Sequence, residues 1–180
     1  MRISHALAAL TLTCTAACAQ SPAPTSDAPA LIGGKNFRYA AIEHTGPYTD
    51  YPAVLREYRD AAQQAGLKLT APVMTLYWNS PLYVAPAQLK WDVGQALGAK
   101  DVVPAKSILV TKTFNYPKLA AATHRGSYLT TYETINRIYD WIAAQKLATA
   151  GGPCVERYLD LDAPAVPAAQ VATEIWIPVK

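Results

Sequence analysis

A pentapeptide near the start of the chain recurs later in a related form. His44-Thr45-Gly46-Pro47-Tyr48 is followed 80 residues on by His124-Arg125-Gly126-Ser127-Tyr128. One long period of this kind is typical of a duplicated half-domain, since a solenoid needs several copies of a shorter unit. With small increases in the offset, the register holds to the end of the chain. The aligned pairs include Leu55 with Ile135, Tyr58 with Ile138, Ala62 with Ile142, Tyr77 with Tyr158 and Asp92 with Glu174.

The N-terminal residues have the pattern of an export signal. Arg2 is followed by an uncharged apolar run and by small residues around Cys18. We therefore predict that residues 1–18 are a lipoprotein-type signal peptide with lipidation at Cys18. The alternative is cleavage after Ala19, which would give a soluble secreted form. Residues 19–35 are rich in Ala, Pro, Ser and Thr and are predicted to be a flexible tether, so we expect an exported, periplasmic protein anchored to a membrane by its lipid.

Charge and cysteine content exclude several classes of protein. The chain has 16 Lys and Arg against 13 Asp and Glu, a net charge of +3, which is too small for a nucleic-acid-binding surface. After export, Cys154 remains without a disulfide partner. No group of His, Cys, Asp and Glu has the spacing of a metal site. We expect a monomer with no metal and no nucleic-acid partner.

Residues 36–180 are predicted to form one domain built from two repeats, residues 36–104 and 105–180. In each repeat a strand leads to a glycine turn, a helix with one apolar stripe, and further strands. Helices that pack on one sheet face give a two-layer α+β domain, and the opposite sheet face is free to hold a ligand. The predicted strands are residues 37–45, 73–78, 88–93, 106–114, 119–125, 154–161 and 171–179, and the predicted helices run from residue 49 or 50 to the glycine at 66 and from about 130 to 146.

Alternation along the later strands suggests a site. Glu174 and Trp176 share one face of the last strand, and Glu156 and Tyr158 share one face of the strand before it. Tyr77 occupies the duplicate position of Tyr158. If these faces meet in one cavity, two carboxylates converge with aromatic side chains, an arrangement that suits a flat or cationic ligand.

Other interpretations of these residues remain open. Glu174 could instead lie on a solvated face in an ion pair with Arg157 or Lys180, where it would contribute little. A buried glutamate could also act as a general acid or base, which makes a hydrolase an alternative function. His44 and His124 adjoin the turn glycines in both copies and are predicted to be structural.

Three segments in this order resemble a known family, the GyrI-like small-molecule-binding domains, which also serve as effector-binding domains of AraC- and MerR-type multidrug regulators. They are His124-Arg125-Gly126-Ser127-Tyr128, Pro153-Cys154-Val155-Glu156-Arg157-Tyr158-Leu159 and Thr173-Glu174-Ile175-Trp176-Ile177-Pro178-Val179. The resemblance covers about residues 36–180. It implies two tandem β-α-β-β (SHS2-type) repeats with pseudo-twofold symmetry, an antiparallel sheet with two packed helices, and a pocket between the repeats for lipophilic, cationic or aromatic compounds.

The resemblance also implies roles for individual residues. Glu174 is the first ligand-binding candidate at the pocket floor and Glu156 the second, with Trp176, Tyr158 and Tyr77 as aromatic walls. Some members hydrolyse strained electrophilic rings with paired glutamates, for which Glu156 and Glu174 are the candidates here. Haem-binding SOUL proteins are similar at a distance, so haem is an alternative to the expectation of no cofactor.

The leading prediction is a non-enzymatic domain that binds small amphiphilic molecules at the cell envelope. Because the chain combines an export signal with no expected DNA-binding half, transcription control is not predicted. A cofactor-independent hydrolase is the first alternative. A protein-interaction module at the envelope is the second.

Overall fold

The computed structural model describes residues 27–69, 72–161, 166–167 and 170–180. The predicted signal peptide, the lipidation site Cys18 and residues 19–26 of the predicted tether lie outside the described residues. Within the described ranges, no helix combines the length and apolar character needed to cross a membrane.

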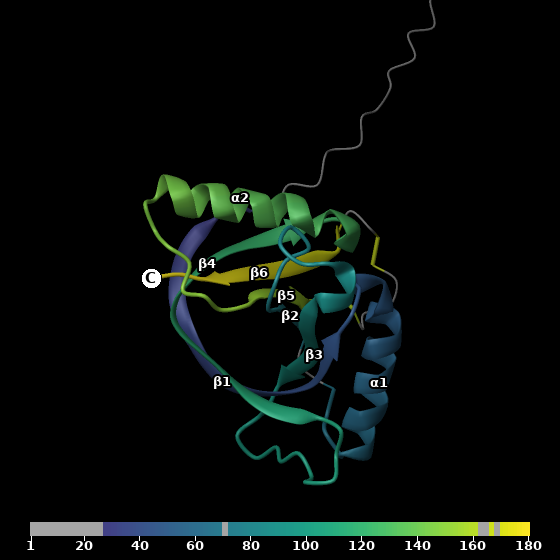
Figure 1. The fold of residues 1–180 in the computed structure, drawn as a ribbon. Helices are drawn as coiled ribbons and strands as arrows, with labels where there is room; N and C mark the ends of the chain where they lie inside the picture. Colours follow the sequence, from purple (N-terminus) through teal and green to yellow (C-terminus); the bar gives the residue numbers. More distant parts are fainter. Residues whose placement is uncertain (1–26, 70–71, 162–165, 168–169) are drawn as a thin grey trace, which may run out of the picture.

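Six antiparallel strands close into a barrel in the order β1-β3-β2-β5-β6-β4 (Figure 1). The predicted α+β class with a tandem β-α-β-β repeat is confirmed. The first repeat comprises β1 (Ala30–Thr45), α1 (Tyr51–Gln64), β2 (Val73–Tyr77) and β3 (Lys90–Ala96), and the second comprises β4 (Val110–Arg125), α2 (Thr131–Ala144), β5 (Cys154–Tyr158) and β6 (Ala172–Pro178).

Strands β1 and β4 are longer than predicted, and they pair with each other to close the barrel. β1 begins at Ala30, within the segment predicted to be tether. The two strands predicted on either side of Pro117 are one continuous strand, β4. Next to Pro117, β4 lies very close to Gly34 of β1. A Cβ added at Gly34 would lie 2.1 Å from the Tyr116 carbonyl oxygen. A glycine at this crossing therefore lets β4 continue through its proline.

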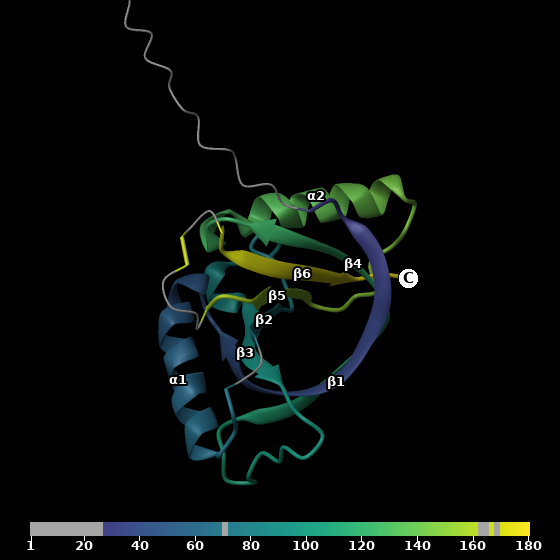
Figure 2. The same ribbon diagram turned by 180° about the vertical axis from the view of Figure 1, so that it is seen from behind.

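The helices lie outside the barrel, and their predicted apolar stripes are buried (Figure 2). α1 packs on β1 and β3, and α2 packs on β4 and β6. Ile138 and Ile142 of α2 cover Ile175 and Ile177 of β6. A separate cluster of apolar side chains fills the barrel interior, and it includes Tyr39, Met74, Leu76, Phe114, Leu119, Val155 and Trp176. Each strand thus has one face toward the helices and one toward the interior.

Candidate functional site

Glu156 lies at the centre of the sheet and points toward the helices. It is directly opposite Thr75 of β2 on one side and Ile175 of β6 on the other. Residues directly opposite each other share a face of the sheet, and Ile175 packs beneath α2. Only 5% of the Glu156 surface is exposed. This strand pairing therefore places the carboxyl group of Glu156 under the helix layer, where the two repeats meet.

Tyrosine side chains surround this carboxyl group. The Tyr158 hydroxyl donates a hydrogen bond of 2.8 Å to Glu156 Oε2, and it lies 3.2 Å from the Tyr77 hydroxyl. Three further rings pack around this pair, with centroid distances of 5.0 Å for Tyr48 to Tyr77, 5.8 Å for Tyr51 to Tyr158 and 5.2 Å for Tyr128 to Tyr158. We call these five residues, Tyr48, Tyr51, Tyr77, Tyr128 and Tyr158, the tyrosine cluster.

The repeat explains how four of these tyrosines come together. Tyr48 and Tyr128 end the two copies of the pentapeptide, and each begins a short 3-10 turn that leads into its helix. The chain reverses before Tyr128 at Gly126, whose φ of 124° favours glycine. Tyr77 and Tyr158 are also duplicate positions. The pseudo-twofold arrangement therefore brings two pairs of equivalent tyrosines to one place.

Sequence reasoning identified part of this site. It named Glu156, Tyr158 and Tyr77, which the structure brings together, and it missed Tyr48 and Tyr128. The signal was present, because both copies of the pentapeptide end in tyrosine. Tyr51 and Thr131, also missed, had no such signal, since they are duplicate positions of each other and hold different residue types.

In the absence of a bound cation, the electrostatics of the site favour the protonated, neutral form of Glu156. Burial raises the pKa of the Glu156 carboxyl, and hydrogen bonds from Tyr158 and Thr131 oppose this only in part. Among the described residues, no Lys or Arg forms an ion pair with Glu156. Burial also raises the pKa of Tyr48 to about 12 and that of Tyr77 well above its usual range, so the surrounding hydroxyls stay neutral.

Two buried hydroxyl groups near Glu156 are unsatisfied. Tyr51 Oη and Thr75 Oγ1 make no hydrogen bond of normal geometry within the described part of the chain. Leaving such a group unpaired costs about 1–3 kcal/mol. The site therefore offers polar atoms that a bound molecule could satisfy, in addition to the carboxyl group.

The predicted convergence of Glu156 with Glu174 is wrong. Arg157, and not Glu156, lies opposite Glu174 in the β5–β6 pair. Glu174 and Trp176 therefore face the barrel interior, while Glu156 and Tyr158 face the helices. The alternation within each strand was right, but the register between the strands puts the sheet between the two acids. Glu174 forms an ion pair with Arg157, which is one of the alternatives that the sequence left open.

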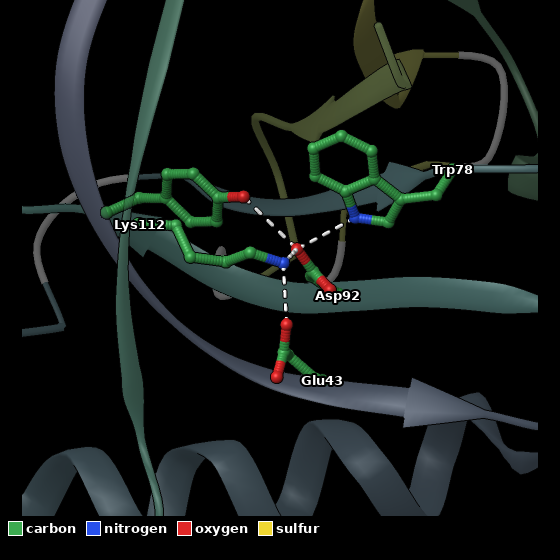
Figure 3. A network of polar contacts seen from close by, with 5 residues as sticks. Glu43, Trp78, Asp92 and Lys112 are labelled. Atoms are coloured by element: carbon green, nitrogen blue, oxygen red, sulfur yellow. Dashed lines mark hydrogen bonds and ion pairs between the residues drawn. The ribbon is translucent and has the colours of Figure 1, made fainter.

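Asp92, the duplicate position of Glu174, also forms an ion pair, with Lys112 (Figure 3). Its Oδ2 accepts hydrogen bonds from Lys112 at 2.8 Å, Trp78 Nε1 at 2.9 Å and the Tyr39 hydroxyl at 3.1 Å. Lys112 Nζ also donates to Glu43 Oε1 at 2.8 Å and lies 4.8 Å from the Trp78 ring centroid. These contacts join β1, β3 and β4, so the network links the two repeats.

The contacts of His124 do not fit an axial haem ligand. His124 is 3% exposed, and its ring nitrogens contact the Thr134 hydroxyl at 2.9 Å and the Ser127 carbonyl at 3.1 Å. His44 Nε2 contacts Asp50 at 3.0 Å. An axial haem ligand needs a free imidazole nitrogen beside an open pocket. The described residues also contain no group of three or more His, Cys, Asp or Glu that could hold a metal ion.

Comparisons with known proteins identify the fold. Residues 35–180 match the family model of the GyrI-like small molecule binding domain. The EcmrR C-terminal domain superposes with a TM-score of 0.70 at 19% identity, covering 86% of this chain and 98% of its own. An uncharacterised conserved protein from Listeria innocua gives 0.66 at 12% identity (86% and 93% covered), and a hydrolase from Listeria innocua gives 0.61 at 12% (88% and 94%). Identities this low show a shared fold alone. No match was found among curated proteins.

Proposed function

Since the chain belongs to the GyrI-like family of small-molecule-binding domains, we propose that it binds lipophilic cations at Glu156. The observation that carries this proposal is a carboxyl group 5% exposed beneath the tyrosine cluster, with no Lys or Arg ion pair among the described residues. A cation that enters relieves the desolvation of the carboxylate and gains contact with the ring faces.

The position of the tyrosines supports access from solvent. Tyr48, Tyr51, Tyr77 and Tyr128 are partly exposed, whereas Glu156 lies beneath them. Tyr48 and Tyr128 belong to the 3-10 turns ahead of the two helices, and not to the strands. Rotation of these rings would open a path between the helix starts to the carboxyl group. A flat aromatic cation would then stack between rings that now pack on each other.

Fluorescence anisotropy with rhodamine 6G, a lipophilic cationic dye, tests this proposal. Glu156→Gln keeps the size of the side chain and removes its charge, so the dissociation constant should rise about tenfold or more. Glu174→Gln is the matched control, because Glu174 lies on the opposite face of the sheet and should leave dye binding unchanged. Equal affinity in the wild type and in Glu156→Gln would refute the site.

A hydrolytic role is the second candidate, and it rests on Glu156 alone. Because the sheet separates Glu156 from Glu174, the two acids do not act together on one substrate. The raised pKa of Glu156 and its hydrogen bond from Tyr158 suit a general acid. Turnover of an epoxide-bearing aromatic compound, abolished in Glu156→Gln, would support hydrolysis, and binding without turnover would support a binding domain without enzymatic activity.

The proposed place of action is the bacterial envelope. What supports it is the sequence of residues 1–18, with the lipidation candidate Cys18 and an alternative cleavage after Ala19. Expression of the full chain with Cys18→Ala, followed by membrane fractionation, tests the anchor. The wild type should sediment with membranes and the variant should not. A wild type that stays soluble after export would favour the secreted form.

A further inference from the structure

A hollow of about 370 Å³ lies at one end of the barrel interior, on the face of the sheet opposite Glu156. Its volume is within the range of small-molecule sites. Its apolar lining includes Phe37, Met74 and Trp176, and its charged lining consists of Lys35, Arg157 and Glu174. Ile32 and Ala96 complete the lining. The lining residues come from five strands, β1, β2, β3, β5 and β6, so the hollow is formed by the barrel itself and not by one loop.

The charges in this hollow favour an anion. Arg157 forms an ion pair with Glu174, and its guanidinium carbon lies 4.5 Å from the centroid of the Trp176 ring. Lys35 is exposed and forms no ion pair with any residue that the structure describes. Two cations against one carboxylate leave the hollow with one excess positive charge. Glu174 is already neutralised, so a second cation would have to displace Arg157.

The apolar lining is suited to a flat body. Phe37 meets Trp176 edge-on at a centroid distance of 6.5 Å and stacks on Phe114 at 5.2 Å. Met74, which also lines the hollow, is buried. The Arg157 side chain is 23% exposed and is already held by Glu174 and the Trp176 ring, so little of its freedom is lost when an anion binds.

From these observations we propose that the hollow is a second binding site, for small amphiphiles that carry one negative charge, such as aromatic carboxylates or sulfonates. The anionic group lies between Arg157 and Lys35, and the apolar body rests on Phe37 and Trp176. The adjacent residues Glu156 and Arg157 then serve two sites of opposite charge preference, one on each face of β5. This proposal does not depend on the cation site.

The probe for this site is 8-anilinonaphthalene-1-sulfonate, titrated by fluorescence and by isothermal calorimetry for stoichiometry. The wild type should bind one probe molecule saturably. Lys35→Glu and Arg157→Gln should each weaken binding about tenfold, and Glu174→Gln should strengthen it several-fold, because it removes the acid that competes for Arg157. Lys100→Glu is the matched control, since it makes the same charge change at an exposed lysine outside the hollow.

The variants separate this site from the one at Glu156. Glu156→Gln should leave the sulfonate affinity unchanged, and rhodamine 6G should not displace the sulfonate. Lys35→Glu alters an exposed side chain, so it keeps the test valid if Arg157→Gln fails to fold. The proposal is overturned if the wild type does not bind saturably, if Lys35→Glu binds as tightly as Lys100→Glu, or if Glu156→Gln abolishes sulfonate binding.

Discussion

Thr75 and Glu156 lie directly opposite each other in the β2–β5 pair, and they are also duplicate positions of the two repeats. The pseudo-twofold axis therefore passes between them. Directly opposite side chains have Cβ atoms about 5 Å apart, so an acid at both positions would bury two carboxyl groups in contact, which raises the cost of charging either one. A threonine in one repeat lets a single carboxyl group occupy the axis beneath the tyrosine cluster.

Thr75→Val should stabilise the fold. Valine has nearly the shape of threonine and removes a buried hydroxyl that makes no hydrogen bond of normal geometry, so the free energy of unfolding should rise by about 1 kcal/mol. Urea denaturation measures the change. Thr111→Val, at an exposed position of β4, should change it by no more than about 0.5 kcal/mol. A loss of stability in Thr75→Val would show that the hydroxyl is satisfied.

The stability should depend on pH through Glu156. Burial raises its pKa in the folded state above the value in the unfolded chain, so the folded protein holds this proton more tightly. The resulting stabilisation is full below the unfolded pKa of about 4.3 and is lost as the pH rises through the folded pKa. Urea denaturation from pH 4 to 8 should show the wild type losing stability relative to Glu156→Gln. A difference that is constant with pH would contradict this.

Lys112→Met should destabilise the protein by about 2–3 kcal/mol. The change leaves the carboxylate of Asp92, whose side chain is 3% exposed, without its cation, although hydrogen bonds from Trp78 and Tyr39 remain. Glu43→Gln removes the other, 57% exposed partner of Lys112 and should cost less than about 1 kcal/mol. Thermal and urea unfolding measure both.

A double variant tests whether charge is the cause of that effect. Asp92→Asn combined with Lys112→Met removes both charges, so it should recover part of the stability lost in Lys112→Met alone. If the double variant is no more stable than Lys112→Met, the loss comes from side-chain packing and not from an unpaired carboxylate.

Gly94→Ala should be among the most damaging single-methyl changes in the barrel. An added Cβ would lie 2.1 Å from the Ala40 carbonyl oxygen, so β1 and β3 would have to separate, at a cost of about 3 kcal/mol or more. Gly33→Ala in β1 is the control, because no atom lies within 4 Å of its added Cβ. It should change the unfolding free energy by less than about 1 kcal/mol. Similar unfolding midpoints for both variants would contradict the close strand contact.

Features caused by neighbouring residues were predicted from the sequence, and features caused by distant parts of the chain were missed. The helix stripes at Tyr58 and Ile138 were found because helical periodicity is visible within a few turns. The ends of β1 and the continuity of β4 through Pro117 were not found. They depend on pairing with a strand about 80 residues away, and on Gly34 being the residue that meets the proline.

The sequence by itself determined two equivalent modules and the order of their elements, because duplication, apolar periodicity and turn glycines can be recognised without knowing which strands pair. It also determined which residues of a strand share a face. Only the tertiary structure decided how those faces meet, since a shift of one residue in register between two strands exchanges the faces. The observed pairing of Arg157 with Glu174 leaves Glu156 beneath the helices among tyrosines, and it leaves Glu174 and Trp176 on the barrel interior face.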